Sequence, residues 1–84
     1  MRHWASSAFW ALYEALPPDV CETADRNFEL LKVDPRHPSL HFKRIGKAWY
    51  ARVGERHRAL GHDVRGGIKW FWIGPLAEYD KLVG

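Results

Sequence analysis

Two arginines near the middle of the chain have a spacing that suits a phosphate site. Arg52 and Arg58 lie on either side of Gly54-Glu55, which is typical of a two-residue hairpin turn, so their strands should pair and bring them together. A guanidinium group stays charged at any working pH and can donate two parallel hydrogen bonds to phosphate oxygens. As a strand residue, Arg58 is expected to be exposed. The pair predicts contacts with a phosphate-rich ligand.

The distribution of charge supports the same interpretation. Residues 41–69 carry eight Lys/Arg against two Asp/Glu, a net charge of +6, whereas residues 1–40 have a net charge of −2. Within this basic segment we assign Lys43 and Arg56 to binding of RNA phosphates. Such an excess of positive charge favours a nucleic-acid partner. The alternative is a solvated face, since exposed Lys and Arg also protect sheet edges.

Metal-free cleavage of RNA would need a base, an acid and cations that stabilise charge on the reacting phosphate. His57 is a candidate for proton transfer, because an ordinary imidazole has a pKa of about 6.5. Tyr79 could act as an acid through its phenol or stack on a base. The alternatives are a half-exposed strand histidine and a tyrosine that packs the last helix. If the ligand is RNA, the catalytic candidates are four residues: Arg52, Arg58, His57 and Tyr79.

The remaining composition argues against metal, cofactor and membrane chemistry. Cys21 is the single cysteine, and His37 and His41 lack companions at metal-ligand spacing, so we expect no metal and no cofactor. No apolar run approaches the roughly 20 residues that span a bilayer, and the first residues lack the layout of a signal peptide. We expect a cytoplasmic protein that does not bind membranes.

An N-terminal helical hairpin should support these side chains. The 84 residues, of which 46% are hydrophobic, suit one domain. Ser6 or Ser7 can cap a first helix, which Pro17-Pro18 ends. Asp19 can cap a second helix that continues to about Val33. We expect these amphipathic helices to pack side by side on a sheet.

Four extended segments follow the rigid turn at residues 34–38. They are rich in aromatic and β-branched residues, and glycine-containing turns separate them. Their expected ranges are 39–45, 49–53, 56–60 and 68–73. A short closing helix at residues 77–83 completes the prediction. The result is a single α+β domain, residues 1–84, with a four-stranded, mainly antiparallel sheet.

The last strand should lie in the middle of the sheet, because residues 68–73 are apolar on both faces. In a regular strand Trp70 and Trp72 share one face, and Phe71 and Ile73 share the other. One group should pack under the helices while the other is exposed. An exposed apolar patch bordered by arginine suits a partner protein, and we assign Trp70 and Trp72 to partner binding.

Four motifs span nearly the whole chain. They are Phe-Trp-x-x-Tyr-x-x-Leu-Pro from Phe9, Asp-Pro-x-His-Pro-Ser-Leu-x-Phe-Lys from Asp34, Arg-Val-Gly leading to Arg-Ala-Leu-Gly from Arg52, and Trp-Phe-Trp-Ile-Gly from Trp70. Together with two helices before the strands, they resemble a subgroup of the RelE/ParE superfamily, the bacterial toxins of type II toxin-antitoxin pairs.

The resemblance implies a helical hairpin on an antiparallel sheet and a toxin held inactive by a cognate antitoxin, which also links the pair to operator DNA. RelE-like members enter the ribosomal A site and cleave mRNA, whereas ParE-like members poison DNA gyrase. Arg52 and Arg58 resemble the phosphate-contacting residues of RelE-like members. The leading expectation is therefore a ribosome-dependent mRNA endoribonuclease that arrests growth.

One position departs from the resemblance. The motif has a histidine before Ala-Glu-Tyr, and here that position is Leu76, which cannot transfer a proton. His57 would have to replace it. Two alternatives follow: a gyrase inhibitor that needs no catalytic residues, and a degenerate toxin that only binds its antitoxin. Fold alone does not separate them.

Overall fold

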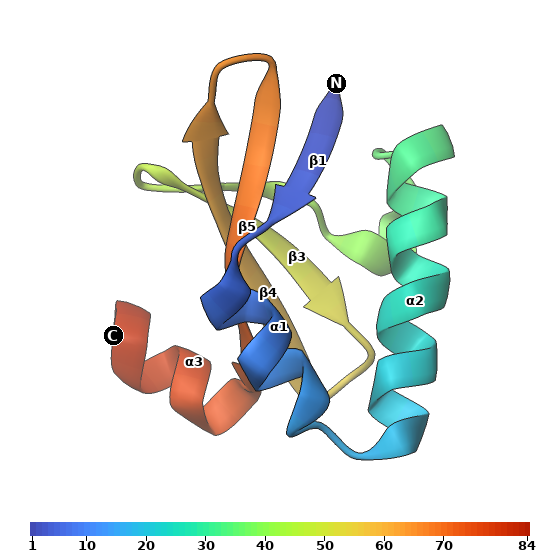
Figure 1. The fold of residues 1–84 in the computed structure, drawn as a ribbon, viewed down its shortest axis with the longest axis vertical. Helices are drawn as coiled ribbons and strands as arrows, with labels where there is room; N and C mark the ends of the chain where they lie inside the picture. Colours follow the sequence, from blue (N-terminus) through green and yellow to red (C-terminus); the bar gives the residue numbers. More distant parts are fainter.

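A five-stranded sheet and three helices form the protein in the computed structural model, which describes residues 1–84 (Figure 1). The strands are β1 (Arg2–Ala5), β2 (Lys43–Ile45), β3 (Ala48–Val53), β4 (His57–Val64) and β5 (Gly67–Pro75). The helices are α1 (Ser7–Glu14), α2 (Pro18–Val33) and α3 (Leu76–Val83), with a 3-10 turn, η1 (Pro38–Leu40). The predicted α+β class is confirmed, whereas the predicted number of strands is wrong. None of the helices is long and apolar enough to cross a membrane.

The strand that the sequence analysis missed is β1. The order across the sheet is β1-β5-β4-β3-β2, so β5 has a strand on either side but lies second from the edge, and β4 takes the middle position predicted for β5. β1 runs parallel to β5, while the other neighbouring strands are antiparallel. β1 has only four residues, and Arg2 pairs with Gly67, 65 positions later (67 − 2). Such a pairing leaves no local pattern in the sequence, because both partners are needed to form it.

The first two helices begin at different kinds of cap. Ser6 caps α1 as predicted, and its hydroxyl accepts a hydrogen bond from the backbone N–H of Phe9 at 3.1 Å. α2 begins at Pro18 after Pro17, so the predicted cap at Asp19 is wrong. Proline fits a first helical position because its missing N–H would have no partner there. Asp19 instead lies in the first turn of α2, where negative charge is favourable.

The predicted strand at residues 39–45 begins only at Lys43. Its first part forms η1, and His41 then takes a left-handed backbone with a φ of 45°. A left-handed residue interrupts an extended strand, which explains the late start. β4 and β5 are both longer than predicted and pair along most of their length.

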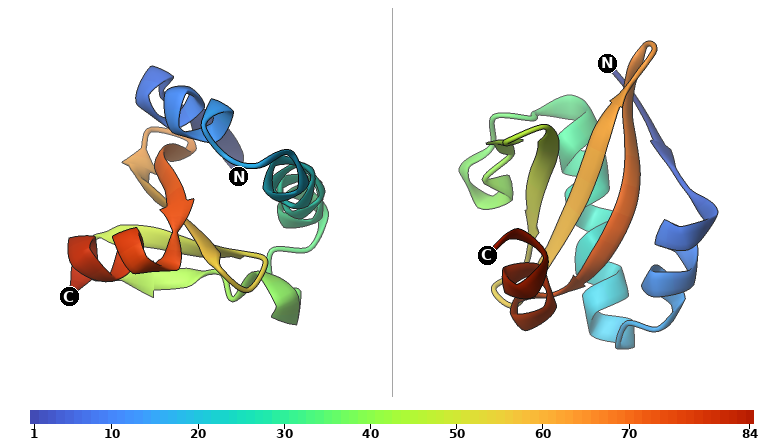
Figure 2. Two further views of the ribbon diagram at one scale, coloured as in Figure 1. Left: turned by 90° about the horizontal axis from the view of Figure 1, so that it is seen from below. Right: turned by 90° about the vertical axis from the view of Figure 1, so that its left-hand side faces the viewer.

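The two faces of the sheet carry separate apolar clusters. α1 packs on β5 and α2 packs on β3, both on one face, which we call the helix face (Figure 2). Its core contains eight buried residues: Leu31, Leu40, Ala51, Val53, Ala59, Ile68, Trp70 and Ile73. On the opposite face, which we call the open face, α3 covers one corner and completes a cluster of Tyr50, Leu60 and Tyr79. The rest of the open face carries no helix.

A β-bulge changes which side chains of β5 share a face. Gly61 pairs with Trp70 and Leu60 pairs with Trp72, so Phe71 has no partner on β4. The extra residue places Phe71 and Trp72 together on the open face, while Trp70 lies in the helix-face core. The prediction that the two tryptophans share a face is therefore wrong.

Candidate nucleic-acid interface

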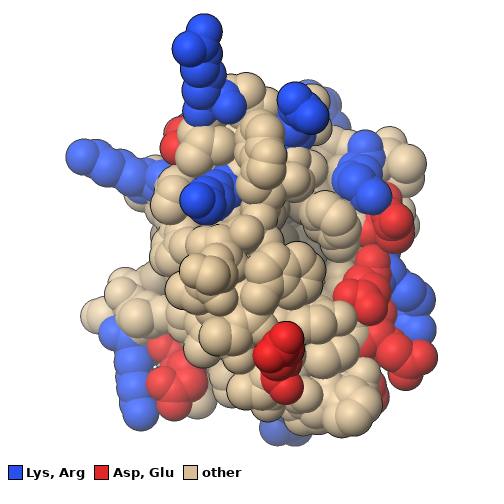
Figure 3. Space-filling view, in the orientation of Figure 1, with Lys and Arg blue, Asp and Glu red and all other residues tan.

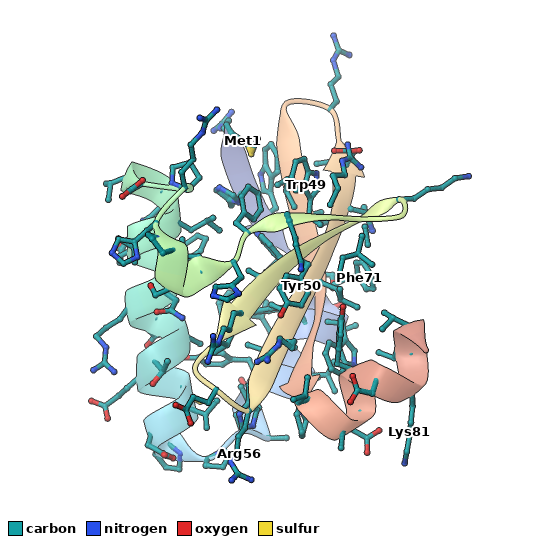
Figure 4. The ribbon with its side chains drawn as sticks, turned by 180° about the vertical axis from the view of Figure 1, so that it is seen from behind. Met1, Trp49, Tyr50, Arg56, Phe71 and Lys81 are labelled. Carbon is teal, nitrogen blue, oxygen red and sulfur yellow. The ribbon has the colours of Figure 1, made fainter.

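Basic and aromatic side chains gather on the open face where β2, β3 and β4 pair. Lys43 lies opposite Tyr50, and Arg52 lies opposite Arg58. Tyr50 and Arg52 are two residues apart on β3 and therefore point to the same face. Figure 4 views this face, with Tyr50 near its middle. The structure thus brings together three of the basic residues predicted from the sequence.

Tyr50 is the centre of this group, and the sequence analysis did not assign it a role. Its ring centroid lies 5.1 Å from Nζ of Lys43, 6.0 Å from Cζ of Arg58 and 5.5 Å from the ring of Tyr79. Only 8% of Tyr50 is exposed. The signal that would have found it is its spacing of two from Arg52 in a predicted strand. A ring held between two cations orients them by cation–π attraction.

Arg58 is buried, contrary to the expectation of an exposed strand residue, with 9% of its surface accessible. Its Nη1 donates to the backbone carbonyls of His57 at 2.7 Å, Glu55 at 3.2 Å and Gly54 at 3.4 Å. The side chain folds back over the β3–β4 turn, because the turn directs these carbonyls toward it. Its Nε is buried and has no acceptor. Arg58 is therefore a fixed cation with an unused donor.

Arg52 is held beside Arg58 by a shared acceptor. The Nε of Arg52 donates to the carbonyl of Gly54 at 3.0 Å, the same oxygen that Arg58 contacts. Gly54 has a φ of 66°, a backbone conformation that favours glycine. Neither arginine forms an ion pair with a carboxylate. Two guanidinium groups thus converge without a negative charge, which is unfavourable unless an anion binds them.

His41 joins the group from the loop before β2. Its Nε2 lies 3.5 Å from Nη1 of Arg52, and its ring is exposed. The left-handed backbone of His41 after η1 gives the ring this position. In the sequence, His41 stands out only as a possible metal ligand. No group of three His, Cys, Asp or Glu lies close enough to bind a metal ion.

Tyr79 lies on α3 against Tyr50, as a member of the open-face cluster. Burial raises its pKa, the neighbouring Tyr50 and Asp80 raise it further, and the charge of Arg58 opposes them. The phenol therefore keeps its proton at neutral pH, and only 8% of Tyr79 is exposed. Leu76, at the position where the resemblance would place a histidine, packs against the same cluster.

The side chain of His57 lies on the opposite face of the sheet from the side chains of the two arginines, although His57 directly precedes Arg58 in the chain. It pairs with Val53 of the helix-face core and lies in a shallow pocket with Asp19 of α2. Burial lowers the pKa of His57, and the charge of Arg58 lowers it too, against the effect of Asp19. Arg56 is exposed in the turn and lines the same pocket. This placement does not support the expectation that His57 transfers the proton in place of the histidine missing at position 76.

The two tryptophans assigned to partner binding also separate. Trp70 is 5% exposed, and its Nε1 donates to Nδ1 of His3 at 3.1 Å. The prediction of an exposed patch is wrong for Trp70, because the bulge places it in the core. Trp72 is half-buried on the open face, where its ring lies over Gly74 and packs with Leu76.

An apolar hollow of about 340 Å³ lies on the helix face between α1 and α2 (Figure 3). Its lining includes six aromatic side chains: Trp4, Phe9, Trp10, Tyr13, Phe28 and Trp70. Acidic side chains gather beside it over α2. At its border Tyr13 donates to a carboxylate oxygen of Asp25 at 2.7 Å, and this bond raises the pKa of Tyr13 to about 12. The expected close packing of the two helices is interrupted here.

The part of the open face around the two arginines thus combines positive charge, phenols and the exposed imidazole of His41, a set that can bind a phosphodiester and move protons beside it. Lys43, Arg52 and Arg58 carry the charge, and Tyr79 and His41 carry the ionisable phenol and imidazole.

No family model, curated protein or solved structure matches this chain.

Proposed function

We propose that the protein is the toxin of a type II toxin-antitoxin pair of the RelE/ParE superfamily, and that it arrests growth by cleaving mRNA on the ribosome. The observation that carries the proposal is the convergence of Arg52 and Arg58 without a carboxylate. A phosphodiester supplies the missing negative charge and accepts bidentate hydrogen bonds. The helices on one face of a mainly antiparallel sheet support the proposal further, as do the sequence motifs. Lys43 lies on the open face with the two arginines and adds a third positive charge.

In the proposed reaction the 2′-oxygen attacks the adjacent phosphorus while the bond to the 5′-oxygen breaks. The Nε2 of His41 takes the proton of the 2′-hydroxyl, and Tyr79 donates a proton to the departing 5′-oxygen. Arg52 and Arg58 stabilise the negative charge that develops on the phosphate oxygens. The products are a 2′,3′-cyclic phosphate and a free 5′-hydroxyl. Lys43 binds the adjoining phosphate.

We propose that the cognate antitoxin binds the apolar hollow, to whose lining Trp70 contributes, instead of a shared patch of Trp70 and Trp72. The hollow offers an aromatic lining, and Trp10 at its border is 50% exposed. α2 beside it carries four acidic residues and two basic ones. A matching segment would insert apolar side chains and carry Lys or Arg at its flanks. Operator DNA then contacts the antitoxin.

The apolar side chain of Leu76 favours a second candidate function, one without catalysis. This side chain belongs to the apolar cluster of Tyr50, Leu60 and Tyr79, so no imidazole stands at the end of β5. A protein that binds its target without cleaving it would need none. The second candidate is therefore an inhibitor of DNA gyrase, or a degenerate toxin that only binds its antitoxin.

The test is ribosome-dependent cleavage by the parent protein and the Arg52→Ala and Arg65→Ala variants. The parent should produce new 5′ ends within codons of ribosome-bound mRNA. Arg52→Ala should lose about a hundredfold or more of the rate, because a contact to the transition state is removed. Arg65→Ala is the matched control, since Arg65 is exposed in the β4–β5 turn, and should cleave like the parent.

Other outcomes decide among the functions. Intact mRNA with loss of DNA supercoiling would replace the nuclease by the gyrase inhibitor. Normal growth of bacteria that contain soluble protein would leave only the degenerate toxin.

A further inference from the structure

The β-bulge has a consequence for ligand binding, because it turns an additional aromatic ring onto the open face. Phe71 has no partner on β4 and lies on the same face as Trp72. Its ring stacks on His62, with centroids 5.2 Å apart and planes 21° from parallel. His62 is exposed and Phe71 is half-buried, so the pair is accessible. Bulges often re-aim side chains near functional sites.

Gly61 permits this arrangement. A Cβ at this position would lie 2.7 Å from Cγ2 of Ile68 and 3.0 Å from the ring of Trp70. Trp70 fills the space on the helix face where a side chain of residue 61 would point. The helix-face core and the aromatic pair on the open face are therefore set by one local distortion of the β4–β5 pairing.

The pair lies in line with the arginines. His62 and Arg58 are four residues apart on β4 and point to the same face, which places their Cα atoms about 13 Å apart at the usual rise of a strand. Lys69 lies opposite His62 and is exposed. The neighbouring carboxylate, that of Asp63, is turned to the helix face, where it accepts from Arg44 and Trp49. Positive charge thus continues along the open face from the arginines to the aromatic pair.

We propose that the His62–Phe71 pair is a base-stacking subsite, which holds one nucleobase of a single-stranded RNA whose phosphate lies at Arg52 and Arg58. The inference rests on the proposed function of the open face. Basic residues that follow the backbone, combined with aromatic rings that stack on bases, are how proteins bind single strands. A flat, accessible ring beside Lys69 provides this combination.

The experiment measures binding of a labelled single-stranded uridine dodecamer and of an abasic strand with the same phosphates. Phe71→Leu keeps an apolar side chain and removes the ring, so affinity for the uridine strand should fall about tenfold, within the range of a single base stack. Affinity for the abasic strand should not change. Phe71→Tyr should restore binding of the uridine strand.

Salt dependence separates stacking from charge. Arg52→Ala should reduce the slope of log affinity against log salt by about 0.7, the change for one phosphate contact to a single strand. Phe71→Leu should leave the slope at its parental value. Val33→Ala, a change at an 81% exposed apolar position at the end of α2, is the control and should bind both strands like the parent.

Failure of the subsite and failure of the function give different results. If the parent cleaves ribosome-bound mRNA and Phe71→Leu binds the uridine strand with parental affinity, the subsite is wrong and the function stands. An equal loss on the uridine and abasic strands would also reject stacking. A parent protein that neither cleaves mRNA nor binds the uridine strand would reject both.

Discussion

The helix face and the open face of this sheet are built from the same strands but differ in what stabilises them. On β3, Ala51 and Val53 point into the helix-face core, whereas Tyr50 and Arg52 point to the open face. Ala51 and Val53 are held by apolar burial, whereas Tyr50 packs against the ring of Tyr79 and Arg52 donates to the carbonyl of Gly54. Because side chains alternate along a strand, a shift of one residue would exchange the two sets.

The contrast extends to charge. The helix face has an apolar hollow with acidic side chains beside it over α2, and the open face has basic side chains with no carboxylate paired to the two arginines. The two faces of one small sheet therefore differ in the charged side chains around them. The comparison predicts that changes on the helix face affect mainly stability, while changes on the open face affect mainly function.

The largest effect on stability is expected from the helix face. Ile68 is fully buried, so Ile68→Ala should lower the free energy of unfolding by about 2–5 kcal/mol through lost burial and an unfilled cavity. Urea unfolding followed by circular dichroism measures this change. Leu82→Ala, at a 58% exposed position on α3, is the control and should change it by less than about 0.5 kcal/mol. Equal effects of the two variants would contradict the assigned core.

Arg58 should be an exception to the contrast between the faces, because its replacement should reduce both stability and function. Arg58→Ala leaves three backbone carbonyls without their donor, so the free energy of unfolding should fall by about 1–3 kcal/mol, in addition to the loss of cleavage. Arg65→Ala, measured beside it, should be close to the parent. A fully stable Arg58→Ala protein would show that these hydrogen bonds do not support the turn.

The smallest expected effect is the pH dependence of folding stability that comes from Tyr13, beside the hollow. Its pKa is raised to about 12 in the folded protein, chiefly by the hydrogen bond to Asp25, and is about 10 when unfolded. The bond should therefore stabilise the fold fully below about pH 10 and lose this contribution as the pH rises toward about 12. The pair is exposed and screened by solvent, so its contribution should stay within about 1 kcal/mol.

Spectroscopic titration of the tyrosines tests this prediction. Asp25→Asn should return the pKa of Tyr13 toward its ordinary value, with Tyr13→Phe identifying its signal. Tyr79 on the open face should titrate as in the parent, because burial is the main cause of its raised pKa. If the Asp25→Asn protein titrates like the parent, the bond between Tyr13 and Asp25 is not present in solution.

The sequence alone determined the features that depend on nearby residues. The Ser6 cap, the end of α1 before Pro17 and the tight turn at Gly54 follow from local backbone chemistry. The hairpin itself was predicted correctly, but the predicted two-residue turn is wrong, because its loop has three residues, 54–56. The third loop residue places Arg52 opposite Arg58, whereas a two-residue turn would have placed Arg52 opposite His57. The helix cap and the hairpin could be predicted because each depends on contacts within a few positions in the chain.

Only the tertiary structure decided which of the candidate residues meet. β1 forms because β5 offers it an edge 65 positions away, and the bulge lies at Gly61, where the ring of Trp70 occupies the space of a side chain. The bulge separated Trp70 from Trp72, and the alternation of β4 removed His57 from the arginines. The loop before β2 brought His41 to Arg52 instead. Local propensity extends over a few residues, whereas these outcomes depend on which distant surfaces can be buried together.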